Sequence, residues 1–357
     1  MAYLTKQESE NAYLVGVSLS NKDDIEISLK ELKSLCETAG LNVVGHTFQY
    51  IRQITPSTLI GSGKVEDIKK EVENNNANVV VVDYELSGSQ VRNLTDCLNV
   101  KVIDRITLIL DIFAQRATSN EGKLQVELAQ LKYNLPRLAG ISGTSGRFGG
   151  SGVGMRGPGE TKLELNKRIA QNNIYKLEKE IEKIKQNRDV QRKNRKENGI
   201  CKVAIVGYTN AGKSTLLNLI TKSSIYADDK LFATLDTTSR TVWLCEGKKI
   251  VLTDTVGFIS KLPHDLVDAF SSTLDEAKDA DIILHVIDVS NPHYKNQIEV
   301  VNNVLSSLNV KTNIIKVYNK CDKVVEKDNK DGIYISAKQN IGIEDLKKEI
   351  INIMDKL

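Results

Sequence analysis

The stretch ICKVAIVGYTNAGKST, residues 200–215, decides the fold of the C-terminal part of the chain. Its first half, Ile200 to Val206, is apolar and rich in β-branched residues, which predicts a buried strand. Its second half, Gly207 to Ser214, matches the pattern G-x-x-x-x-G-K-[ST], in which a glycine-rich turn joins a strand to a helix. These features predict a phosphate-binding loop in a mostly parallel, doubly wound α/β sheet.

The loop carries the groups that a nucleoside triphosphate requires. Backbone N–H groups can curl around the phosphates, Lys213 can bridge the β- and γ-phosphates, and the Ser214 hydroxyl can ligate Mg²⁺. The pattern alone does not distinguish ATP from GTP. The predicted phosphate-side residues are Gly207, Tyr208, Thr209, Asn210, Ala211, Gly212, Lys213, Ser214 and Thr215.

The base is read by a second pattern, Asn319-Lys-Cys-Asp322, which follows the apolar run Asn313 to Tyr318 and fits N-K-x-D. A carboxylate at Asp322 can accept both the N1–H and the exocyclic amino group of guanine, and adenine does not present that pair of donors. Asn319 is expected to brace the phosphate loop and Lys320 to lie along the base. The loop Ser336-Ala337-Lys338, after the predicted strand Gly332 to Ile335, is expected to offer the Ala337 N–H to guanine O6.

A third pattern, D-x-x-G, follows the predicted strand Lys249 to Thr253 and reads Asp254-Thr255-Val256-Gly257. Asp254 is expected to hold Mg²⁺ through water, and the Gly257 N–H to contact the γ-phosphate. Phe258 comes next, where many GTPases place a glutamine that orients the attacking water. Because phenylalanine cannot orient water, unassisted hydrolysis is expected to be slow.

Residues 231–240, LFATLDTTSR, precede a predicted strand at Thr241 to Cys245 and form the candidate switch I segment. One of its threonines is expected to ligate Mg²⁺. Spacing alone does not choose among Thr234, Thr237 and Thr238.

The rest of the chain divides into two regions. Residues 1–104 alternate β-branched runs (13–20, 41–51, 79–83 and 100–104) with helical patterns (24–39, 64–73 and 87–98), which predicts a small N-terminal α/β domain. The helical pattern of residues 105–198 predicts a long antiparallel helical hairpin, with one helix from Arg105 to about Leu135 and another from about Glu160 to Asn198. The glycine-rich segment 140–159 forms its tip, and residues 199–357 form the third domain.

The second hairpin helix combines an apolar stripe with a basic face. Leu163, Ile169, Ile174, Leu177, Ile181 and Ile184 recur at spacings near three to four, and the first hairpin helix is their expected partner. Residues 162–198 hold 12 Lys or Arg and 6 Asp or Glu, a balance of 12 − 6 = +6, whereas the whole chain carries +3. A solvated helix face and an RNA-binding surface both explain this excess.

Composition argues against a membrane-spanning protein, a secreted protein and a protein with a structural metal site. The chain has 40% hydrophobic residues and no apolar run long enough to span a bilayer, and residues 1–10 lack an apolar signal core, so a cytoplasmic protein is expected. Its 5 cysteines and 4 histidines show no metal-ligand spacing.

In these motifs the chain resembles the HflX family of translation-associated GTPases, within the Obg/Era-like group. The resemblance rests on GYTNAGKSTL (207–216), LFATLD (231–236), LTDTVGFISK (252–261) and LPHDLVDAFSSTLD (262–275), and on RGPGETKLEL (156–165) and LIGSGKVEDIK (59–69). It implies an N-terminal α/β domain, a helical hairpin and a G domain, with GTP and GDP as ligands. It also implies action on the large ribosomal subunit and its rRNA, contacted through the basic hairpin and the N-terminal domain, and the splitting of stalled or idle ribosomes. We expect a monomer.

The resemblance also assigns roles in the candidate site. It implies Thr234 as the switch I ligand of Mg²⁺, beside Ser214 and Asp254, although Thr237 stands where the family usually has proline. It makes K⁺ a further candidate cofactor at Asn210, where a loop-bracing hydrogen bond is the plainer interpretation. Lys213, Thr234 and Gly257 are the predicted catalytic residues. The other predicted nucleotide-binding residues are Phe232, Ala233, Thr234, Asp254, Thr255, Val256, Gly257, Asn319, Lys320, Asp322, Ser336, Ala337 and Lys338.

Two other functions remain open from the residues. The GTPase could regulate another RNA-linked or DNA-linked factor, in which case large ribosomal subunits would not alter nucleotide turnover. Alternatively, nucleotide could merely stabilise the shape of a ribosome anti-association factor that needs no hydrolytic switch.

Overall fold

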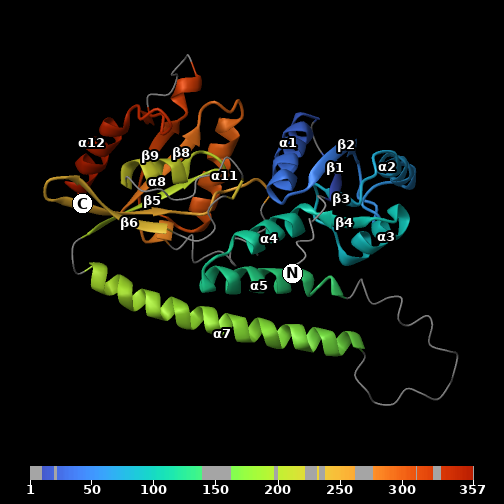
Figure 1. Ribbon diagram of the computed structural model, residues 1–357. Coiled ribbons are helices and arrows are strands. Elements are labelled where there is room, and N and C mark those ends of the chain that lie inside the picture. The colour runs from blue at the N-terminus through green and yellow to red at the C-terminus, as the bar shows by residue number, and fades with distance from the viewer. Residues whose placement is uncertain are drawn as a thin grey trace, which may run out of the picture. The chain divides into compact units, whose positions relative to one another are not determined.

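The computed structural model describes residues 10–19, 22–138, 162–196, 200–221, 231–232, 238–261, 276–310, 312–324 and 331–356 (Figure 1). The chain divides into two compact units. The first contains residues 1–115 and 126–179, and the second contains residues 116–125 and 180–357. Across the described residues, we find no helix that is both long and apolar enough to cross a membrane.

The first unit contains a four-stranded parallel sheet. Its strands are β1 (Asn11–Ser18), β2 (Asn42–Tyr50), β3 (Val79–Val82) and β4 (Lys101–Asp104), in the order β2-β1-β3-β4. All four residues of β3 are buried, as expected for a parallel strand covered on both faces. The helices are α1 (Lys22–Thr38), α2 (Ser62–Asn74) and α3 (Gly88–Leu98). The predicted strands and helices of residues 11–104 are therefore confirmed within a few residues.

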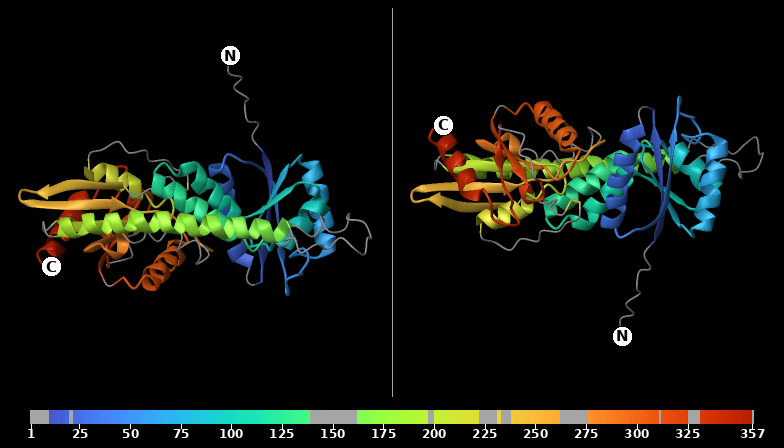
Figure 2. Two further views of the ribbon diagram at one scale, coloured as in Figure 1. Left: turned by 90° about the horizontal axis from the view of Figure 1, so that it is seen from below. Right: turned by 90° about the horizontal axis from the view of Figure 1, so that it is seen from above.

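The two faces of this sheet are covered by different helices. Figure 2 shows α1 on one face and α2 and α3 on the other. Alternation along β1 explains this arrangement, because Tyr13, Val15 and Val17 belong to the core that includes Ile68 of α2 and Leu94 of α3. Gly16 points to the opposite face, where a Cβ would lie 3.0 Å from the Leu29 side chain of α1.

The expected single helix from Arg105 to Leu135 is wrong, because the structure has two helices there, α4 (Arg105–Arg116) and α5 (Asn120–Asn134). The Ser119 hydroxyl accepts a hydrogen bond from the Gly122 N–H at 2.8 Å, which is the bond that starts a new helix. A polar Thr-Ser-Asn run therefore ends one helix and begins the next.

The second long helix is observed as α7 (Lys162–Lys196). Leu177 is buried, but Ile169 is 49% exposed and Ala170 is buried in its place, so the predicted apolar stripe is wrong at Ile169. Lys132 of α5 lies 2.7 Å from Glu178 of α7, which pairs the two helices at that point. The predicted tip, residues 140–159, lies outside the described residues.

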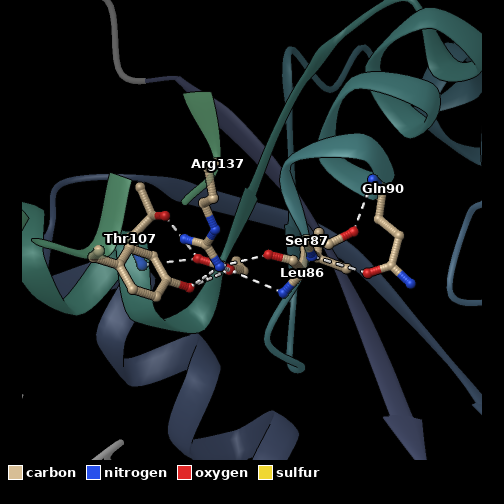
Figure 3. Close-up of polar contacts among 7 residues, drawn as sticks. Leu86, Ser87, Gln90, Thr107 and Arg137 are labelled. Carbon is tan, nitrogen blue, oxygen red and sulfur yellow. Dashed lines mark hydrogen bonds and ion pairs between the residues drawn. The ribbon is translucent and has the colours of Figure 1, made fainter. Parts of the chain in front are cut away.

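A buried polar cluster joins the end of α5 to the carboxyl end of β4 (Figure 3). Asp104 Oδ2 accepts hydrogen bonds from the Leu86 N–H at 3.1 Å, the Tyr133 hydroxyl at 2.5 Å and the Arg137 guanidinium at 2.8 Å. Its Oδ1 accepts from the N–H and hydroxyl of Thr107 at 2.9 and 2.7 Å. Burial and the Asp104 carboxylate raise the pKa of Tyr133, so the hydroxyl keeps its proton.

The second unit contains a six-stranded sheet. Its strands are β5 (Cys201–Gly207), β6 (Thr238–Cys245), β7 (Lys248–Asp254), β8 (Ile282–Asp288), β9 (Asn313–Asn319) and β10 (Ile333–Tyr334). The order is β10-β9-β8-β5-β7-β6, and only β6 runs antiparallel to its neighbour. The mostly parallel sheet is confirmed. Strand β8 and helix α11 (Tyr294–Ser307) are additional elements that the sequence patterns do not predict.

Helices complete the second unit. Leu216 and Leu217 of α8 (Lys213–Thr221) and Leu346 and Ile350 of α12 (Ile343–Met354) form one core cluster with β5, β7, β8 and β9. Helix α11 contacts β5 and β8 without joining that cluster, as expected for a helix on the other face. The short 3₁₀ helix η2 (Cys321–Lys323) follows β9.

Candidate functional site

The loop 207–212 links β5 to α8, as predicted from its glycines. Gly212 has a left-handed φ of 94°, and a Cβ there would lie 2.3 Å from Asn319 Nδ2, so both its conformation and its neighbour require glycine. Lys213 begins α8 and is buried. Its Nζ donates to the carbonyl oxygens of Gly207 and Tyr208 at 3.1 and 2.8 Å, so the ammonium lies inside the curve of the loop.

Burial controls the charge of Lys213. It lowers the pKa of Lys213 to about 8, and the Asp254 carboxylate opposes this shift. An anion arriving at the loop would stabilise the ammonium and raise this pKa. Negative charge on a ligand therefore favours its binding at this loop.

Asp254 ends β7 beside the first turn of α8. The Ser214 hydroxyl donates to Asp254 Oδ2 at 2.7 Å, and the Asp254 side chain is almost fully buried. A hydroxyl and a carboxylate are the hard oxygen donors that Mg²⁺ prefers. The donor set at Ser214 and Asp254 therefore fits the predicted ion.

Gly257 brings the D-x-x-G turn against the loop. A Cβ at Gly257 would lie 2.9 Å from Lys213 Nζ and 2.9 Å from Thr209 Cγ2, so only glycine permits this approach. Thr209 Oγ1 is buried and has no hydrogen-bond partner in the described part of the chain. Thr255 anchors the turn by donating from its hydroxyl to the Ile205 carbonyl at 2.7 Å, and Val256 is buried.

Phe258 pairs with the loop through its backbone. Its N–H donates to the Gly207 carbonyl at 3.1 Å, and its carbonyl accepts from the Thr209 N–H at 2.8 Å, which forms a short parallel bridge. The Ser260 N–H adds a hydrogen bond to the Tyr208 hydroxyl at 2.7 Å. The Phe258 side chain is only 4% exposed and therefore packs inward.

Asn319 ties three segments together at the carboxyl end of β9. Its Nδ2 donates to the Ala211 carbonyl at 2.8 Å, and its Oδ1 accepts from the Ala337 N–H at 3.0 Å. The expected bracing of the loop by Asn319 is thus present in the geometry. Lys320 adds a second brace, because its Nζ donates to the Asn210 carbonyl at 2.9 Å.

Asp322 and the 336–338 loop lie beside each other. The Ser336 side chain donates to the Asp322 carboxylate, and this hydrogen bond, with smaller contributions from Lys323 and Lys338, lowers the pKa of Asp322. Asp322 is exposed and its pKa is lowered, so its carboxylate is ionised and accessible to a ligand. These are the properties that recognition of paired N–H donors requires.

The structure thus brings together the loop 207–215, the turn 254–257 and the segments at 319–322 and 336–338. Phe232 is buried with a φ of 53°. Ala233, Thr234 and Thr237 lie outside the described residues. Sequence reasoning missed Asp288, whose Oδ2 lies 2.7 Å from Lys320 Nζ. The available signal was a carboxylate at the end of the apolar run Ile282 to Ile287.

Comparison with known proteins agrees with this geometry. Three family models match successive parts of the chain: GTP-binding GTPase N-terminal at residues 26–114, GTP-binding GTPase Middle Region at 116–195, and 50S ribosome-binding GTPase at 202–320. Among solved structures, a GTP-binding protein from Sulfolobus solfataricus in complex with GDP is similar with a TM-score of 0.51 and 26% identity. That alignment covers 97% of this chain and 99% of the other.

Named relatives are more similar in sequence. GTPase HflX of Caldanaerobacter subterraneus subsp. tengcongensis is 53% identical over 96% of this chain and 80% of the relative. GTPase HflX of Escherichia coli (strain K12) is 40% identical over 94% of this chain and 81% of the relative. With the four nucleotide-binding motifs meeting at one edge of the sheet, identities of this size along nearly the whole length show that the chain belongs to the GTPase HflX family.

Proposed function

We propose that this GTPase is a switch that acts on the large ribosomal subunit and that splits or rescues stalled or idle ribosomes. One observation carries the nucleotide-dependent part: Lys213, Gly257 and the Ser214–Asp254 pair converge on the same loop that Asn319 ties to the 336–338 segment. These contacts support a single site with a phosphate-binding side and a base-binding side.

On the phosphate side, we assign the charge-neutralising role to Lys213, whose ammonium is already enclosed by the loop. We also assign to the Gly257 N–H the contact with the γ-phosphate, and the close approach of Gly257 to Lys213 supports this assignment. When bound, Mg²⁺ neutralises charge on the β- and γ-phosphates. Ser214 and Asp254 would hold it, with Thr234 as the proposed third ligand. Asn210 is the proposed K⁺ contact.

On the base side, we assign guanine recognition to Asp322, with Lys320 along the base. The Ala337 N–H already donates to Asn319 Oδ1, so a contact from Ala337 to guanine O6 would share that N–H between two acceptors. Loss of the Asp322 carboxylate would leave the guanine N–H donors without an acceptor, which is the strongest form of discrimination available to such a site.

The ribosomal part of the proposal rests on charge and family. The model matched at residues 202–320 describes 50S ribosome-binding GTPases. Residues 162–198 carry the excess of +6, and positive side chains on a long helix are suited to the phosphates of rRNA. We propose that α5 and α7 form the two arms of an antiparallel hairpin between an N-terminal domain (1–104) and the G domain (199–357), and that the monomer works in the cytoplasm with its ribosomes.

Steady-state GTP hydrolysis tests this function. We would compare the protein alone and with large ribosomal subunits, in K⁺ and in Na⁺ buffer, and with ATP as a competing substrate. We expect slow hydrolysis alone and strong stimulation by large subunits, with Asp322→Asn losing GTP turnover but gaining xanthosine triphosphate turnover. Intact GTP binding without stimulation would contradict ribosome-activated hydrolysis and favour another RNA-linked factor.

A light-scattering assay of ribosome splitting separates the switch from a passive anti-association factor. We expect Lys213→Ala to abolish both GTP binding and splitting. Retention of splitting by Lys213→Ala would show that nucleotide only stabilises a binding shape.

A further inference from the structure

Lys320 connects the base-binding segment to two other parts of the site. Its Nζ lies 2.9 Å from the Asn210 carbonyl oxygen in the phosphate-side loop and 2.7 Å from Asp288 Oδ2 at the end of β8. In the parallel register, Asp288 stands opposite Asn319, the last residue of β9, so its carboxylate lies next to Lys320. Asp288 belongs to none of the four sequence motifs that predict the site.

The Asp288 carboxylate is itself held in place. Its Oδ1 accepts from the Ser290 N–H at 3.0 Å and from the Ser290 hydroxyl at 2.6 Å, which leaves Oδ2 directed at Lys320. The side chains of Asp288 and Lys320 are only 16% and 23% exposed. The pair is thus shielded from water more than a surface ion pair is, and its charge-assisted hydrogen bond is correspondingly stronger.

Lys320 gains most from such a restraint because its side chain has four rotatable bonds. An unrestrained lysine would lose that freedom each time a nucleotide bound, which weakens binding. Asp288 fixes the ammonium before the ligand arrives. The Lys320 stem is then already extended between Asp288 and the loop carbonyl, where the proposed function places the face of the base.

We propose that Asp288 is a positioning residue for guanine-nucleotide binding: it holds Lys320 against the Asn210 carbonyl, so that Lys320 braces the loop and supports the base. This inference rests on the proposed guanine-binding role of residues 319–322. It predicts an effect on nucleotide affinity and release, and none on the rate of the chemical step at saturation, because among the described residues the hydrogen bonds of the Asp288 side chain go to Lys320 and Ser290.

A double-mutant cycle tests whether Asp288 acts through Lys320. We would measure the release of a fluorescent GDP analogue from the full chain and its Asp288→Asn, Lys320→Ala and doubly substituted variants. We expect release to accelerate about tenfold in Asp288→Asn and at least as much in Lys320→Ala. The double variant should release no more than about twofold faster than Lys320→Ala, because the second change removes an interaction already lost. The kcat of Asp288→Asn at saturating GTP should stay within about twofold of the value for the unsubstituted chain.

Asp281→Asn provides the matched control on the same sheet. Asp281 precedes β8 at its amino end and accepts from the Lys202 N–H at 2.8 Å, away from the loop, so GDP release should not change. If Asp288→Asn does not fold, Ser290→Ala keeps the carboxylate but removes one restraint. It should accelerate release about two- to threefold.

Three results would separate the possible failures. If Asp288→Asn accelerates GDP release equally in the unsubstituted chain and in Lys320→Ala, Asp288 supports the fold rather than Lys320. This result would overturn the inference. Unchanged release in Asp288→Asn and Ser290→Ala, with faster release in Lys320→Ala, would also overturn it while leaving the guanine site intact. Unchanged release in Lys320→Ala would overturn the proposed role of Lys320 at the base, and with it the inference, whereas the base-binding role of Asp322 is tested separately by Asp322→Asn.

Discussion

Asp104→Asn is expected to loosen the end of α5 from the sheet of the first unit. Asparagine keeps the size of the side chain but replaces one carboxylate oxygen with an N–H₂ group and removes the charge. Either orientation of the amide directs donors at donors, because Thr107 donates twice on one side and Leu86, Tyr133 and Arg137 donate on the other.

The magnitude follows from burial. Asp104 is 1% exposed and Arg137 is 11% exposed, so the substitution leaves a mostly buried guanidinium without its carboxylate. Breaking a buried ion pair from one side costs about 3–5 kcal/mol. Tyr133→Phe deletes a single hydroxyl that bonds the charged carboxylate and should cost about 1.5–3 kcal/mol.

Hydrogen exchange read by mass spectrometry is the suitable assay, because a protein of two units need not unfold in one step. Protection should fall in residues 126–138 and in the turn at residues 83–87, and should stay unchanged in β5 and α8. Asp96→Asn is the control, since Asp96 is 69% exposed and lies 3.8 Å from Arg92, and should cost about 0–1 kcal/mol. A loss below about 1 kcal/mol in Asp104→Asn, with exchange of residues 126–138 unchanged, would refute the reasoning.

Three further outcomes are expected from the nucleotide site. GDP affinity should fall as pH rises above about 8, by up to tenfold per pH unit, because the free protein then loses the Lys213 proton and GDP binding has to restore it. Calorimetry in buffers of different ionisation enthalpy would detect this proton uptake. Absence of proton uptake would contradict the lowered pKa of Lys213. Gly212→Ala should weaken GDP binding more than tenfold in a fluorescence titration by displacing Asn319, whereas Gly40→Ala, also at a left-handed φ but with open space around it, should leave binding unchanged. Phe258→Gln should lower the free energy of unfolding in urea by about 1–3 kcal/mol, because the side chain at this position is buried. It should not raise the rate of unassisted GTP hydrolysis, because the backbone of residue 258 is bound to the loop, and a tenfold faster hydrolysis rate would contradict this.

The strand ends were predictable because parallel strands impose them. Runs of β-branched residues that end at Gly207, Asp254 and Asn319 each place a polar or phosphate-binding group at a carboxyl end. In one parallel sheet these ends share an edge, so three separate motifs predict one site. The observed register agrees with this reasoning.

The missed features depend on tertiary contacts that local patterns do not contain. Strand β8 includes His285, a buried histidine whose pKa burial lowers to about 4, and a titratable residue inside an apolar run weakens the strand signal. On α7, Ala170 is buried and Ile169 is exposed. The side of a helix that becomes buried depends on the packing of the neighbouring elements, which the spacing of apolar residues alone does not show. The break before Ser119 interrupts an otherwise helical pattern through one side-chain hydrogen bond.

Phe258 shows how a departure from a common pattern acquires a physical meaning in the structure. The sequence alone shows only that position 258 lacks a side chain that could orient water. In the structure, its N–H and carbonyl bind Gly207 and Thr209, so the residue after Gly257 is fixed to the phosphate-side loop through its backbone, and its side chain is buried. Replacing the side chain cannot release that backbone. Another group, such as a segment that moves on nucleotide binding, the proposed K⁺ or a partner, would have to orient the water, which is why stimulation by large ribosomal subunits is the decisive test of the proposed function.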